Sequence, residues 1–71
     1  MQIKITLISE GGYRPLSTLI SCDSWDAFQA NKPHYHKQAI LCILAKRHMT
    51  LWDMRKYGYT AIKSEIYQKE N

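Results

Sequence analysis

The stretch RKYGYT, residues 55–60, decides the fold because it joins a well-marked short helix to a segment of ambiguous periodicity. Gly58 suits the left-handed residue that follows a helix, so the helix is expected to end at Tyr57. A second helix after this glycine would make a helix-turn-helix, with its second helix free to enter a DNA major groove. A strand would instead complete a small antiparallel sheet.

The segment YTAIKSEIY, residues 59–67, fits both structures. As a helix capped by Thr60, it places Ile62 and Ile66 one turn apart. As a strand, it places Thr60, Ile62, Ser64 and Ile66 on one face, and Tyr59, Ala61, Lys63, Glu65 and Tyr67 on the other. Periodicity does not separate the two in so short a run. A strand is favoured because a hairpin with a third strand makes a more stable sheet than an isolated hairpin.

The remaining elements follow from local signals. Apolar residues alternate with polar ones at the N-terminus, which predicts a strand, and Gly11-Gly12 suit the tight turn of a hairpin. Asp23 is the expected N-cap of the next helix. The sequence thus predicts one α+β domain over residues 1–71. Its elements are a β-hairpin (about 2–9 and 13–22), a short helix (24–30), a central buried helix (33–48), a short capped helix (50–57) and a C-terminal strand, or helix (59–67).

The central helix and the short capped helix have distinct signatures. The run AILCILA, residues 39–45, is apolar all round, which predicts a helix buried on every side. In MTLWDMRKYG, residues 49–58, Thr50 and Asp53 form a capping box, and Met49 and Met54 are placed for a hydrophobic staple.

Charge is the main pointer to function. The chain has 71 residues and a net charge of +4, but residues 32–63 alone carry seven Lys or Arg and one acid, a net of +6. Such a segment favours a polyanionic partner or an acidic protein surface, although it also serves as a solvated face.

Several classes are disfavoured. The sequence shows no catalytic or phosphate-binding motif, so we expect neither an enzyme nor a cofactor. His34 and His36 diverge on a helix, so no metal site is expected. Cys22 and Cys42 are too few for a disulfide framework, which indicates a reducing compartment. The N-terminus lacks the features of a signal peptide and no apolar run is long enough to span a membrane, so we expect a cytoplasmic protein.

The favoured hypothesis is a small non-enzymatic binding protein that acts on nucleic acid or a nucleoprotein complex. Its role would be regulatory or accessory, and its size is typical of phage and mobile-element proteins. Cations would contact phosphates, and Tyr57 and Tyr59 would either stack on bases or pack within the fold. The candidate binding residues are Lys37, Lys46, Arg47, Trp52, Arg55, Lys56, Tyr57, Tyr59 and Lys63.

Three alternatives stay open. The first is an inhibitor or adaptor that docks on an acidic surface of a host protein, since Trp, Tyr and Arg are the residues that dominate interface energies. The second is a helix-turn-helix DNA-binding regulator, although residues 60–68 offer no Arg or Asn for reading bases. The third is a homodimer formed through an exposed sheet edge.

Overall fold

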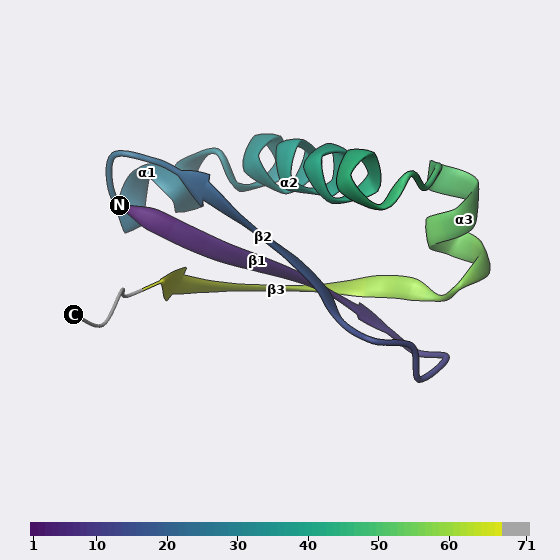
Figure 1. Cartoon of the computed structure of the whole chain (residues 1–71). Coiled ribbons are helices and arrows are strands. Elements are labelled where there is room, and N and C mark those ends of the chain that lie inside the picture. Colours follow the sequence, from purple (N-terminus) through teal and green to yellow (C-terminus); the bar gives the residue numbers. More distant parts are fainter. Residues whose placement is uncertain (68–71) are drawn as a thin grey trace.

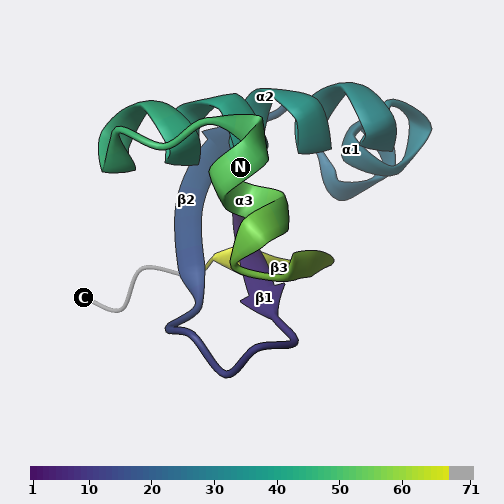
Figure 2. The same cartoon turned by 90° about the vertical axis from the view of Figure 1, so that its right-hand side faces the viewer.

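The computed structural model describes residues 1–67 as two layers, an antiparallel sheet and a set of helices. The sheet has three strands in the order β2-β1-β3, and α1 and α2 lie over one of its faces (Figure 1). Helix α3 connects the end of α2 back to the sheet (Figure 2). The predicted α+β layout is confirmed. Its elements are β1 (Gln2–Ser9), β2 (Leu16–Ser21), α1 (Trp25–Ala30), α2 (Lys32–Arg47), α3 (Leu51–Lys56) and β3 (Tyr59–Tyr67).

The ambiguous C-terminal segment is a strand. β3 pairs antiparallel with β1, which lies in the centre of the sheet and pairs with β2 on its other side. The pairing supplies partners for the second edge of β1, which a lone hairpin would leave open. The helix-turn-helix alternative is therefore wrong, because the residues that would form its recognition helix are extended and paired.

Tyr59 lies on the opposite sheet face from the one predicted. Ser9 pairs with Tyr59 while Ile8 pairs with Ala61, so Thr60 is an extra residue on β3. Such a β-bulge shifts the alternation of side chains. Tyr59 consequently shares a face with Ile62 and points into the core beside Leu7, whereas the simple period of two placed it on the face opposite Ile62.

The hairpin connection is longer than the predicted two-residue turn. Strand β1 ends at Ser9 and β2 begins at Leu16, not at residue 13 as predicted. Gly12 takes a positive φ of 82°, so it does supply the left-handed conformation of a turn. The ring of Tyr13 is occupied by an edge-to-face contact with Tyr57, at 5.0 Å between centroids, rather than by a place in the sheet.

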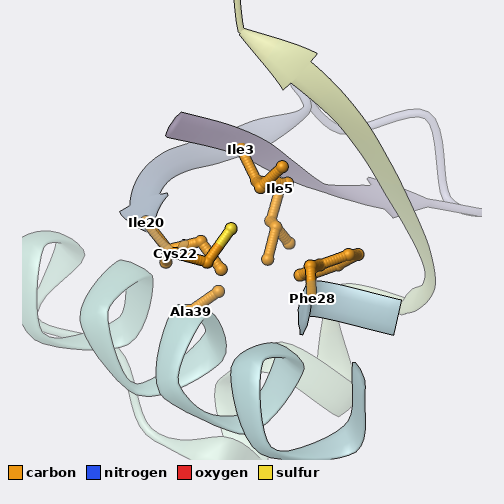
Figure 3. Packing of buried hydrophobic residues seen from close by; sticks show 6 residues of the cluster. All are labelled: Ile3, Ile5, Ile20, Cys22, Phe28 and Ala39. Carbon is orange, nitrogen blue, oxygen red and sulfur yellow. The ribbon is translucent and has the colours of Figure 1, made fainter. Parts of the chain in front are cut away.

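The core lies between the sheet and the helices. Ile3, Ile5 and Leu7 of β1 are fully buried, as is Phe28 of α1. Figure 3 shows Ile3, Ile5, Ile20 and Cys22 meeting Phe28 and Ala39 from the helices.

Helix α2 covers this core with one side only. Its buried residues are Ala39, Ile43 and Leu44, whereas Leu41 is 53% exposed. The expectation of a helix buried on every side is therefore wrong, because a fold of two layers leaves the outer side of its helices in solvent. Within residues 1–67, no helix is long and apolar enough to cross a membrane.

Candidate interaction surface

Positive charge concentrates on the helical layer. Residues 32–56 carry six Lys or Arg and a single acid, Asp53. Lys46 and Arg47 occupy the last turn of α2, and Arg55 and Lys56 the last turn of α3, where cations complement the negative end of the helix dipole.

The one acid in this stretch is already engaged in α3. The Asp53 carboxylate accepts a hydrogen bond from the Thr50 amide at 3.0 Å, and the Thr50 hydroxyl accepts one from the Asp53 amide at 3.1 Å. The predicted capping box is thus confirmed, and Gly58 follows the helix with a φ of 76°. This closed arrangement fixes the start of α3 and so orients the side chains on its outer side.

The outer side of α3 exposes a large apolar ring between cations. Trp52 is 73% exposed and Leu51 is 59% exposed. Arg55 and Lys56 follow Trp52 at helical spacings of three and four, so they share its side of the helix. We call Leu51, Trp52, Arg55 and Lys56 the α3 surface. Trp52 has the largest exposed fraction among the large apolar side chains of residues 1–67, and with Leu51 it forms an exposed apolar patch.

The opposite side of α3 is packed against the sheet. Met54 and Tyr57 contact the cluster that contains Leu7, Leu16 and Ile43. Met49 joins the same cluster, as the predicted hydrophobic staple requires. Helix α3 therefore has one side that stabilises the fold and another that contributes nothing to the core.

The two candidate tyrosines serve the fold. Tyr59 is only 6% exposed, and its hydroxyl donates to the Arg14 carbonyl at 2.7 Å. Tyr57 is half-buried against Tyr13, and its carbonyl accepts a hydrogen bond from the Ser9 hydroxyl. Packing, one of the two roles that the sequence allowed, is what the structure shows; base stacking by Tyr59 is excluded by its burial.

The other candidate residues are spread over separate places. Lys37 lies on the outer side of α2, beside a shallow depression that His34, Gln38 and Leu41 also line. The Lys46 ammonium leans towards β2 and donates to the Thr18 hydroxyl at 3.5 Å. Lys63 pairs with Thr6 on the sheet face that the helices leave open. The nine candidates therefore do not form one surface, and the α3 surface brings only three of them together.

Sequence reasoning missed the two exposed leucines of the helices, Leu41 and Leu51. Leu41 belongs to an apolar run that was expected to be buried, so its exposure had no signal in the pattern. Leu51 had none either: it lies three residues before the inward-facing Met54, a spacing that favours the same side of the helix, yet it is exposed.

His36 joins α2 to the edge of the sheet. Its Nε2 lies 3.0 Å from the Ser64 hydroxyl of β3, and its ring packs 5.9 Å from that of Phe28. Partial burial, and secondly the positive charge of Lys32, hold the pKa of His36 below its ordinary value of 6.5. A neutral ring at this place keeps its hydrogen bond to Ser64 without burying a charge.

No cluster of metal ligands accompanies these histidines: residues 1–67 contain no group of three or more His, Cys, Asp or Glu side chains that could hold an ion. Comparison of the chain with protein-family models, with curated proteins and with solved structures finds no match. Among the described residues, Trp52 is the most exposed large apolar side chain, and Arg55 and Lys56 share its side of α3.

Proposed function

We propose that this chain is a small, non-enzymatic binding protein that docks on an acidic surface of another protein through the α3 surface. The observation that carries the proposal is the 73% exposure of Trp52 on the same side of α3 as Arg55 and Lys56. A regulatory, inhibitory or adaptor role fits a domain of this size, which has little room for a deep substrate cleft.

The chemistry of the α3 surface supports a protein partner. Tryptophan and arginine are enriched among the few residues that dominate binding energy at protein interfaces. Leu51 adds exposed apolar area. Burial of this area against an apolar patch on a protein would contribute to the binding free energy, whereas a phosphate backbone offers no apolar surface to bury it. Arg55 and Lys56 would meet carboxylates at the rim and raise the rate of association.

Nucleic acid is the second candidate, and the cations at the ends of both helices favour it. Lys46, Arg47, Arg55 and Lys56 are all exposed and can contact phosphates, and Trp52 can stack on an unpaired base. It ranks second because Tyr57 and Tyr59, the two tyrosines considered for base stacking, pack within the fold, which leaves Trp52 as the aromatic side chain of the α3 surface.

Site-specific photocrosslinking separates the candidates. A photoreactive phenylalanine analogue placed at Trp52 is expected to capture a protein in cells that express the chain. The matched control carries the analogue at Ser17, which is exposed on β2 and faces away from the helices. The proposal requires capture at position 52 only, reduced by Arg55→Glu with Lys56→Glu. Equal capture at both positions, or capture that ignores the charge reversals, would contradict it.

The second candidate has its own signature. Labelled single- and double-stranded oligonucleotides, titrated at low and physiological salt, should show anisotropy changes that fall steeply with salt if phosphates are the target. Lys46→Ala with Arg47→Ala would then weaken binding equally across sequences. Salt-dependent binding that Trp52→Ala does not change would show that the partner is nucleic acid and not an acidic protein surface.

A further inference from the structure

The outer edge of β3 is long and has no strand beside it among residues 1–67. β3 is nine residues long and lies at the edge of the sheet, with only β1 as its neighbour. Edge strands offer their free N–H and C=O groups to another strand unless something covers or disrupts them. β3 contains no proline after its bulge, and α2 packs mainly against β2, at the other edge.

The end of this strand also exposes apolar side chains. Ile66 is 44% exposed although its partner on β1, Ile3, is fully buried. Tyr67 is exposed on the other face, and Ile62 is only half-buried. The helical layer reaches β3 at Ile62 and Ser64 but leaves the C-terminal end of the strand uncovered, where a neighbouring strand would cover apolar area.

We propose that two copies of the chain pair through β3, antiparallel about a two-fold axis at Ser64, and form one continuous six-stranded sheet. In this register Lys63 of each copy lies opposite Glu65 of the other copy, so the two-fold axis creates two such pairs. On the helix-facing side, Ile62 lies opposite Ile66 of the second copy. Ala61 lies opposite Tyr67 of the second copy on the open side.

Geometry limits the alternatives. Side chains alternate along a strand, and opposed residues of an antiparallel pair share a face, so a symmetric pair must be centred on one residue. Centring on Lys63 would oppose two lysines, and centring on Glu65 would oppose two carboxylates. Like charges directly opposite destabilise a sheet, whereas opposite charges stabilise it. The Lys-Ser-Glu triplet thus selects Ser64 as the centre over both neighbouring registers.

The proposal does not rest on the α3 surface, because none of that surface's residues belongs to β3. A dimer of this kind would carry two copies of that surface and could engage two partner sites at once. Loss of partner binding would therefore not affect the test that follows.

A charge swap tests the pairing by sedimentation velocity. The wild-type chain is expected to dimerise, and Lys63→Glu alone should weaken the dimer on the order of tenfold or more, because it creates two like-charge pairs across the two-fold axis. Glu65→Lys alone should weaken it as well, and it also places a lysine opposite Lys4 of its own chain, so its folding is checked by circular dichroism. The double variant should recover the dimer. Lys37→Glu, which makes the same change in net charge on the outer side of α2, should leave the dimer intact. A monomeric wild-type chain, or a double variant that is folded but does not recover, overturns the proposal.

Cysteine crosslinking tests the register separately. Residues directly opposite in an antiparallel pair lie about 4.5–5.5 Å apart between Cα atoms, within disulfide range. In a Cys42→Ala background, Ser64→Cys should form a disulfide-linked dimer under mild oxidation, and Lys63→Cys should not. The reverse result would show that the pair is centred on Lys63 and would contradict the proposed register.

Discussion

Two short helices of this chain are built alike and used differently. Helices α1 and α3 each have six residues, each is capped by a hydroxyl group, and each contains one tryptophan in its first turn. In α1, the ring of Trp25 packs against the core, with its centroid 5.2 Å from that of the Phe28 ring. In α3, Trp52 has most of its surface in solvent.

The difference shows that the caps fix where a helix lies, whereas the spacing of its apolar residues decides what it presents. Trp25 and Phe28 are three residues apart and share the inward side of α1. In α3 the inward positions are taken by Met54 and Tyr57, which turns Trp52 outward. The first arrangement stabilises the fold, and the second leaves an aromatic ring for a partner.

The largest effect is expected from the inward side of α1. Phe28→Ala removes a fully buried ring from between two helices and the sheet, and should cost about 3–5 kcal/mol in the free energy of unfolding. Urea unfolding followed by circular dichroism measures this cost. A loss below about 1 kcal/mol would show that α1 is not part of the core.

Removal of either helix cap should destabilise the chain less than Phe28→Ala does, and by about the same amount in both helices. The Ser24 hydroxyl accepts from the Ala27 amide at 3.1 Å in α1, as the Thr50 hydroxyl does from the Asp53 amide in α3. Ser24→Ala and Thr50→Ala should therefore each cost about 1 kcal/mol, and the glycine variants less. If only Ser24→Ala destabilises the chain, α3 does not fold with the domain, and the comparison between the helices fails.

Acid should act on the α1 side of the molecule through His36, whose ring lies beside Phe28. The pKa of His36 is lowered in the folded state, so the unfolded chain takes up the proton first as the pH falls. The free energy of unfolding should thus decrease from about its ordinary pKa of 6.5 downward, and stop decreasing below the folded pKa. Unfolding curves at several pH values should show this loss in the wild type and a flatter profile in His36→Gln. An unchanged profile in that variant would assign the loss to other groups.

The smallest effect on stability is expected at the outer side of α3. Trp52→Ala should change the free energy of unfolding by less than about 0.5 kcal/mol, because the ring makes few contacts within the fold. Trp25→Ala is the matched comparison and should cost several times more. Equal costs would mean that Trp52 is packed, which is incompatible with a free binding surface.

Local signals in the sequence were sufficient for α3 but not for every boundary. Thr50, Asp53 and Gly58 mark that helix within a few residues, and the structure confirms each role. For α1 the predicted N-cap, Asp23, is wrong, because the Ser24 hydroxyl caps the helix one residue later. The Cys22 amide donates to the Met1 carbonyl at 3.0 Å, so the chain is still extended beside β1 at this residue, and α1 begins at Trp25.

The parts that sequence did not decide depend on distant contacts. Residues 59–67 are a strand because β1 has a free edge, which periodicity within the segment does not reveal. The bulge that turns Tyr59 inward accompanies a hydrogen bond from the Glu10 amide to the Gly58 carbonyl at 2.9 Å, across the sheet. Trp52, Arg55 and Lys56 share one side of α3 by their local spacing, but that this side faces solvent depends on the packing of Met54 and Tyr57 against the core.

The most direct test of the account is the accessibility of each tryptophan to a quencher. Trp25→Phe leaves Trp52 as the only tryptophan, and Trp52→Phe leaves Trp25. Acrylamide should quench Trp52 much more strongly than Trp25, and Trp52 should emit at longer wavelength, since its ring lies in water. Equal quenching with blue-shifted emission from both rings would show that Trp52 is buried, and would contradict the claim that α3 presents it to a partner.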